Sequence, residues 1–112
     1  MVKRDYKLYL NDIRESIAQI EKYMLGVSEE VFRKDKKLQD AIVMRIMIIG
    51  EATRNLPKVL KEKNREVPWF EIAQFRDLIA HSYYEVSLNR IWSTINERIP
   101  VIKEKLKNIS LV

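Results

Sequence analysis

The sequence predicts an all-α fold, an up-and-down bundle of four helices, or five if a break near the end divides the last one. Apolar residues recur every three or four positions along most of the 112-residue chain, which places them on one face of successive helices. Only 2 glycines and 3 prolines are present, so the chain has few places to turn. A chain of this length is expected to form one helical domain over residues 1–112.

The first helix is expected from about Arg4 to Leu25. Its apolar face consists of Tyr6, Leu10, Ile13, Ile17, Ile20 and Met24. Gly26 ends this helix, because glycine adopts the left-handed C-cap conformation without steric cost. The Ser28 hydroxyl can then cap a short helical turn. From that turn, Val31 and Phe32 are expected to enter the core.

The second long helix is expected from Asp35 to about Leu56, just before Pro57. Its centre, Ala41–Ala52, is apolar almost all round. A helix that is hydrophobic on several sides needs cover on more than one of them. We therefore expect one side to pack inward and another to pack against a second copy, in a homodimer built partly on this helix.

The second half of the chain predicts two more helices. A basic helical turn or loop, Lys58–Arg65, leads to Pro68, which suits the first position of a helix because its missing N–H is not needed there. That helix is expected over Trp69–Ala80, with a loop behind it. The last helix is expected over Leu88–Leu106, and Pro100 should bend or restart it.

The composition narrows the classes of function. The chain has no cysteine, which excludes disulfides, thiolate metal sites and cysteine nucleophiles, and fits a reducing cytoplasm. Its charged start and short apolar stretches predict neither a signal peptide nor a membrane span. The net charge of +5 favours polyanionic partners, but acids are interleaved with the bases. Charge therefore permits RNA binding without requiring it.

Arg76 is the first candidate site residue, because it shares a helical stripe with Ile72 and Ile79. An arginine among apolar residues needs a carboxylate, a carbonyl or an anionic ligand. Asp77 points about 100° away around the helix, so it is not the obvious partner. Glu51, which projects from the second long helix, is the better candidate. Both acids are possible supporting residues.

His81 follows Arg76 by five positions, about 140° away on an unbroken helix, so the two converge only if the chain turns near Ala80. The pair suits RNA cleavage without metal or cofactor. A histidine exchanges protons near neutral pH, and an arginine stabilises the growing charge of a phosphate. Since one histidine cannot easily be both acid and base, a dimer could bring two His81 side chains into one cleft.

Each of these residues also has a purely structural interpretation. A lone histidine at a helix C-terminus often interacts with the helix dipole and a carbonyl. Arg76 could simply close an ion pair, and Tyr83 could be a core aromatic residue with a satisfied hydroxyl. The pattern alone leaves both interpretations open.

The segment Arg76–Tyr83 resembles the signature of HEPN proteins, in which an arginine is followed by a polar residue, three more residues and a histidine. It also resembles the HepT-like extension, in which a tyrosine stands two positions after the histidine. Further stretches similar to that family occur in the same order, namely Tyr9–Ile13, Ile48–Ala52, Val67–Trp69 and Ile91–Ile95. The resemblance thus covers nearly the whole chain.

The resemblance implies an all-α homodimer and a metal-independent endoribonuclease toxin, with Arg76 and His81 as catalytic residues and no cofactor. It also implies a partner, a nucleotidyltransferase antitoxin of the MNT type that can transfer AMP from ATP to the motif tyrosine, here Tyr83. An AMP group would add bulk and negative charge beside Arg76. The alternative is a non-catalytic helical subunit that helps a nucleotidyltransferase to hold its nucleotide or substrate.

Overall fold

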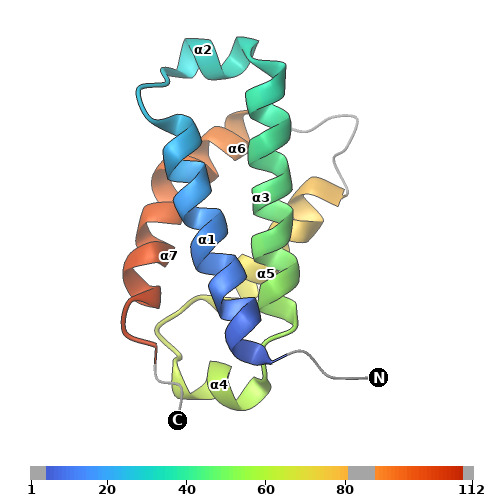
Figure 1. The fold of residues 1–112 in the computed structure, drawn as a ribbon, viewed down its shortest axis with the longest axis vertical. Helices are drawn as coiled ribbons and strands as arrows, with labels where there is room; N and C mark the ends of the chain where they lie inside the picture. Colours follow the sequence, from blue (N-terminus) through green and yellow to red (C-terminus); the bar gives the residue numbers. More distant parts are fainter. Residues whose placement is uncertain (1–4, 81–87, 110–112) are drawn as a thin grey trace.

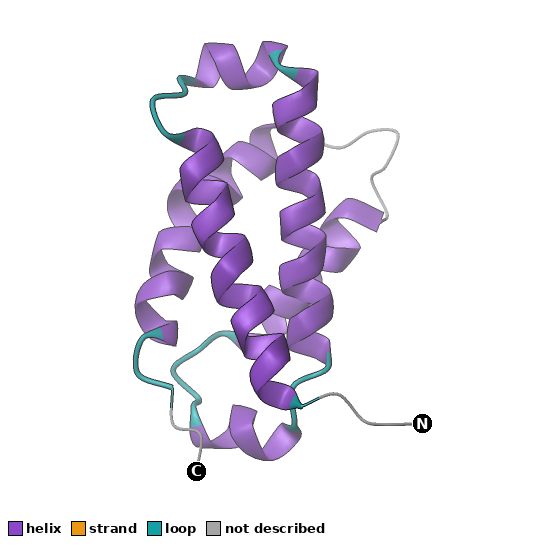
Figure 2. Cartoon of the chain, viewed as in Figure 1, coloured by secondary structure: helices purple, strands orange, loops and turns teal. Residues whose placement is uncertain are grey.

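The computed structural model describes residues 5–80 and 88–109, and all regular structure in these residues is helical (Figures 1 and 2). The elements are α1 (Tyr6–Met24), α2 (Glu29–Lys34), α3 (Lys36–Arg54), α4 (Lys58–Lys63), α5 (Trp69–Ala80), α6 (Leu88–Ser93), the π-helical turn η1 (Thr94–Arg98) and α7 (Ile99–Leu106). The predicted all-α bundle is confirmed. None of the described helices is long and apolar enough to cross a lipid bilayer.

The chain runs up through α1, down through α3, up through α5 and down through α6, η1 and α7 (Figure 1). The short helices α2 and α4 connect the long ones at opposite ends of the bundle. α3 is the central element, since it packs against both α1 and α5. This arrangement positions α5, which carries Arg76, directly on α3.

Side-chain caps start the helices close to where the sequence predicts them. The Ser28 hydroxyl accepts a hydrogen bond from the Val31 N–H at 3.2 Å, and the Asp35 carboxylate accepts one from the Leu38 N–H at 3.0 Å. Gly26 has a φ of 74°, the left-handed conformation expected at the end of the first helix. These signals depend on neighbouring residues only, so the sequence is enough to locate them.

The expectation for Val31 is wrong, while that for Phe32 is confirmed. Phe32 is completely buried, with its ring centroid 5.5 Å from that of Trp92, whereas Val31 is 50% exposed. Adjacent residues on a helix point about 100° apart. The six-residue helix α2 lies across one end of the bundle, so only one of the two side chains can face the core.

Pro68 lies one position away from the place predicted, whereas Pro100 restarts the last helix as predicted, at the beginning of α7. Pro68 precedes α5 instead of being its first residue, and its carbonyl accepts a hydrogen bond from the Ile72 N–H at 3.0 Å. The break near Pro100 is the π-helical turn η1, where the Ile99 N–H reaches back to the Thr94 carbonyl. Proline cannot donate to the carbonyl four residues before it and clashes with it. A wider turn just before Pro100 accommodates both effects.

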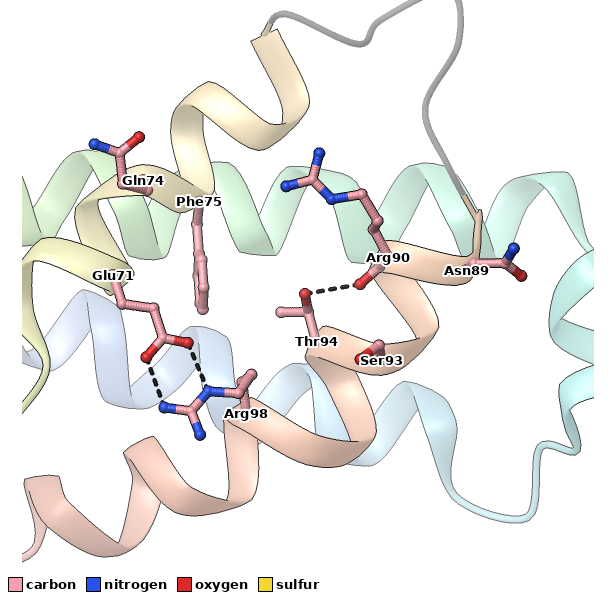
Figure 3. A pocket seen from close by; sticks show the side chains of 8 residues that line it. All are labelled: Glu71, Gln74, Phe75, Asn89, Arg90, Ser93, Thr94 and Arg98. Carbon is pink, nitrogen blue, oxygen red and sulfur yellow. Dashed lines mark hydrogen bonds and ion pairs between the residues drawn. The ribbon is translucent and has the colours of Figure 1, made fainter.

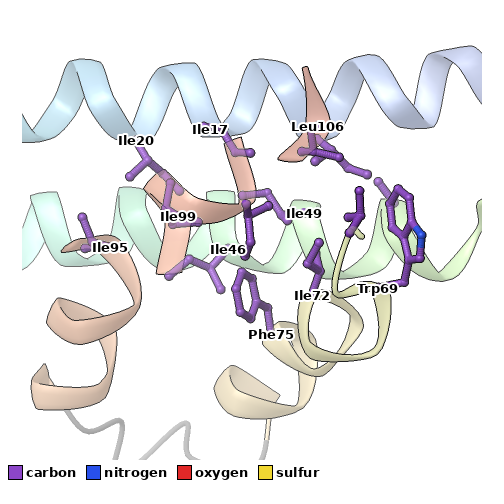
Figure 4. Packing of buried hydrophobic residues seen from close by; sticks show 14 of the residues in the cluster. Ile17, Ile20, Ile46, Ile49, Trp69, Ile72, Phe75, Ile95, Ile99 and Leu106 are labelled. Carbon is purple, nitrogen blue, oxygen red and sulfur yellow. The ribbon is translucent and has the colours of Figure 1, made fainter. Parts of the chain in front are cut away.

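The core lies between α1, α3, α5 and the η1–α7 segment, as Figure 4 shows. Isoleucine dominates it, including fully buried Ile46, Ile49 and Ile72. Phe75 reaches the same core from α5 and is only 4% exposed. The Trp69 indole N–H donates to the Asn64 carbonyl at 2.9 Å, which ties the start of α5 to the segment after α4. α5 is therefore firmly anchored at its N-terminal half.

Candidate active site

Gly50 of α3 lies at a close approach between α3 and α5. A Cβ atom added to Gly50 would lie 2.7 Å from the Arg76 backbone nitrogen and 3.2 Å from the Arg76 Cβ. The first distance is shorter than side-chain carbons normally adopt, so only glycine lets the two helices meet here. The position of the Arg76 backbone is thus set by the absence of a side chain on α3.

The Arg76 side chain pairs with Glu51, the residue next to Gly50. The Arg76 Nε lies 3.2 Å from the Glu51 Oε2. This is the partner that helical placement predicts. Because Nε faces the carboxylate, the two terminal nitrogens of the guanidinium are left to contact another group.

The Arg76–Glu51 pair lies at the surface, although Arg76 shares a helical stripe with the buried Ile72. The Arg76 and Glu51 side chains are 45% and 57% exposed. On α5, Ile72 faces the core and is fully buried, and Arg76 lies about 40° further round the helix. That rotation is enough for a long side chain to reach water at the edge of the α3–α5 contact. An ion pair this exposed contributes about 0–1 kcal/mol, so its value to the fold is small.

Asp77 lies beside a different arginine. Its Oδ1 atom is 3.9 Å from the Arg54 Nη1, and both side chains are partly exposed. Burial lowers the pKa of the nearby Lys61, and repulsion from Arg54 lowers this pKa further. The α3–α5 edge therefore carries cations from α3, α4 and α5 together with the two carboxylates that the sequence singled out.

Two predicted site residues, His81 and Tyr83, lie outside the described residues. α5 is described as far as Ala80, so the convergence of His81 with Arg76 stays a prediction. Among the described residues, no three histidine, cysteine, aspartate or glutamate side chains form a group able to hold a metal ion.

Sequence reasoning did not identify Gly50 as a determinant of the site, nor the pairing of Glu71 with Arg98. The Arg98 side chain donates two hydrogen bonds to the Glu71 carboxylate, both at 2.6 Å. Glu71 and Arg98 are 27 positions apart, so no local spacing reveals this pair. Gly50 did leave a signal, since a glycine inside a helix costs about 0.5–1 kcal/mol relative to alanine and usually has a packing reason.

The comparison with protein families decides where the chain belongs. The family model "Ribonuclease HepT-like" matches residues 13–109. The chain belongs to the HepT-like ribonuclease family. The predicted resemblance is thus confirmed at the level of the family.

Individual relatives agree with this membership. The chain is 40% identical over 108 residues to "Probable ribonuclease HepT" of Thermococcus cleftensis, which covers 96% of this chain and 98% of that protein. It is 43% identical over 108 residues to "Gamma-glutamylcyclotransferase and putative RNase" of Methanocaldococcus jannaschii. That match covers 96% of this chain but 49% of the relative, so the chain spans about half the length of that protein. No solved structure matches the chain.

Proposed function

We propose that this chain is a metal-independent endoribonuclease toxin that cleaves RNA in a cleft between two copies, with Arg76 and His81 as its catalytic residues. One observation carries the proposal. The Arg76 guanidinium is half-exposed, its Nε is held by Glu51, and Arg76 precedes the only histidine of a chain from a ribonuclease family by five positions. A guanidinium oriented in this way can receive a phosphate.

The proposed reaction needs two proton transfers and one anion contact. The ribose 2′-oxygen attacks the adjacent phosphorus, the bond from phosphorus to the 5′-oxygen breaks, and a 2′,3′-cyclic phosphate forms. The terminal N–H groups of Arg76 donate to the phosphate oxygens as their charge grows. His81 takes the proton from the 2′-hydroxyl, and His81 of a second copy gives one to the leaving 5′-oxygen. A homodimer is thus part of the proposal.

The proposed regulation acts on Tyr83. A nucleotidyltransferase antitoxin would transfer AMP from ATP to the tyrosine hydroxyl, and pyrophosphate would leave. The attached AMP carries a negative charge two residues from His81, where it would compete with the RNA phosphate for Arg76.

The test of cleavage compares variants of the purified protein on single-stranded RNA in the presence of EDTA. Removing a general acid–base group typically lowers a rate by about 10²–10⁴-fold, so His81→Ala and Arg76→Ala should abolish most cleavage. Arg65→Ala, which removes an exposed arginine elsewhere, should cleave at the wild-type rate. Circular dichroism should give the same helix content for all four proteins.

Equal cleavage by the wild type and His81→Ala would contradict the proposal. A wild type that binds nucleotide or partner tightly and never cuts RNA would favour the non-catalytic subunit instead. Regulation is tested by co-expression with a nucleotidyltransferase of the MNT type, followed by mass spectrometry. The wild type should gain the mass of AMP, and Tyr83→Phe should not. A monomer mass at every concentration in sedimentation equilibrium would refute the dimer.

A further inference from the structure

Lys61 of α4 is a half-buried cation that no carboxylate compensates in the part of the chain that the structure describes. Its ammonium group makes no hydrogen bond or ion pair with the described residues. Burial lowers the pKa of Lys61, and repulsion from the Arg54 guanidinium lowers this pKa further. Both effects disfavour the charged ammonium group, and a bound anion would oppose both of them.

The Arg54 guanidinium also has its hydrogen-bond donors available. The Asp77 Oδ1 lies 3.9 Å from the Arg54 Nη1, which is beyond hydrogen-bond distance. Among the described residues, no acceptor takes a hydrogen bond from Arg54, and its side chain is 46% exposed. Asp77 therefore offsets part of the charge of Arg54 without occupying its N–H groups.

These two cations lie on the same edge of the bundle as Arg76, nearer to α4. On α3, Arg54 follows Glu51 by three positions, so the two side chains share a face and lie about 4.5 Å apart along the axis. Glu51 in turn holds Arg76 at 3.2 Å. α4 follows the end of α3, at the bottom of Figure 1. Arg76, Arg54 and Lys61 therefore succeed one another from the α3–α5 contact toward α4.

The other basic side chains of α4 have a different environment. Lys58 lies 3.9 Å from the Glu62 carboxylate, and Lys63 is exposed to water. Water hydrates an exposed cation, whereas a half-buried cation beside a second cation gains most from an anion. A phosphate suits this position, because its several oxygens accept from a guanidinium and an ammonium group at once. A local conflict of charge of this kind is more typical of a binding site than of a structural contact.

We propose that Lys61 and Arg54 together bind one backbone phosphate of single-stranded RNA, on the α4 side of the phosphate that Arg76 contacts. The ligand class rests on the proposed ribonuclease function. The Arg54 guanidinium donates to the phosphate oxygens, and the Lys61 ammonium group supplies a point charge. This contact reads no base, so it positions the strand without selecting its sequence. The strand is then held at a second point beside the reacting phosphate, which orients the bond for cleavage.

The first test measures binding without cleavage. The probe is a single-stranded oligoribonucleotide that is 2′-O-methylated throughout and therefore lacks the attacking hydroxyl. Lys61→Gln and Arg54→Gln should each raise its dissociation constant roughly three- to tenfold and reduce the salt slope by about 0.7. The matched controls are Lys63→Gln and Arg65→Gln, which remove the same charges from exposed positions nearby. They should bind within about twofold of the wild type, because salt screens charges that do not contact the strand.

The second test locates the phosphate. A set of probes carries one neutral methylphosphonate linkage each, at a different position along the strand. One linkage should weaken binding to the wild type and have no further effect on binding to Lys61→Gln, because the variant has already lost that contact. Without RNA, the urea midpoint of Lys61→Gln should equal or exceed that of the wild type, because the repulsion from Arg54 is removed.

The outcomes separate the phosphate site from the function on which it rests. If the wild type binds the probe and cleaves RNA while Lys61→Gln weakens binding no more than Lys63→Gln does, the phosphate site alone is overturned. A lower urea midpoint for Lys61→Gln would make Lys61 a structural residue and would also overturn the site. If the wild type neither binds the probe nor cleaves RNA, the proposed function falls too. If it binds the probes in the expected pattern and never cuts RNA, the phosphate site stands and the proposed cleavage falls.

Discussion

The two sides of α5 are held in opposite ways. Toward α3, the backbones meet so closely at Gly50 that a single added carbon would lie 2.7 Å from the Arg76 nitrogen. Toward α6, the helix borders a cleft of about 350 Å³, and the exposed ion pair between Glu71 and Arg98 joins α5 to η1 beside it (Figure 3). Steric contact therefore holds one side of the helix, and an exposed ion pair holds the other. The predictions below test each half of that contrast.

The largest effect is expected at Phe75, which belongs both to the core and to the wall of the cleft. Phe75→Ala should lower the free energy of unfolding by about 3–5 kcal/mol, because it removes a buried ring and leaves a cavity. Phe70→Ala on the same helix is the matched control, since Phe70 is 79% exposed and should change stability by less than about 0.5 kcal/mol. Urea denaturation measures both. Equal losses would mean that α5 is not packed as described.

The contact at Gly50 should give the next largest effect. Gly50→Ala forces α5 to move and should cost about 1–3 kcal/mol, although alanine favours a helix by about 1 kcal/mol over glycine. Lys37→Ala, at an exposed position of α3 outside its apolar centre, should change stability by less than about 0.5 kcal/mol. If Gly50→Ala instead stabilises the protein, helix propensity outweighs the contact. Under the proposed function, Gly50→Ala should also slow RNA cleavage.

The ion pair on the side toward α6 should matter less, and its contribution should depend on salt. Glu71→Gln removes the charge that holds Arg98, so its urea midpoint should lie below that of the wild type at low ionic strength. At high salt this difference should shrink, because salt screens the exposed ion pair of the wild type. Glu15→Gln, an exposed change on α1, should leave the midpoint unchanged at both ionic strengths. If the midpoint falls by the same amount at both ionic strengths, Glu71 stabilises the protein by packing and not by its charge.

These effects also show why the sequence predicts some features and not others. The helix ends were predictable because caps such as Ser28 and Asp35 act within three residues. The Arg76–Glu51 pair was predictable as well, since helical geometry leaves few carboxylates near the arginine. The exposure of Arg76 was not predictable, because a turn of only about 40° around the helix separates Arg76 from the buried Ile72, and this small angle decides whether the side chain faces the core or the solvent.

The features that the sequence concealed depend on how far apart the helices lie. The cleft exists because α5 packs on α3 and leaves a space toward α6, and no residue spacing encodes that distance. Arg98, which pairs with Glu71, is the last residue of the π-helical turn η1, and the wider hydrogen bonding of this turn is not visible in a regular apolar period. Pro100 signalled a break in the helix without specifying its geometry.

The smallest change in stability is expected at Glu51, where the effect on function should be the most specific. Glu51→Gln should cost no more than about 0.2–1 kcal/mol, because the pair with Arg76 is half-exposed. Glu62→Gln is the matched control, since Glu62 is about as exposed as Glu51 and pairs with Lys58. Under the proposed function, only Glu51→Gln should lower the cleavage rate, with the loss in kcat and not in KM, because the Arg76 guanidinium would no longer be held for the transition state. If both variants cleave RNA like the wild type, Glu51 does not position Arg76, and the close approach at Gly50 is then sufficient to place it.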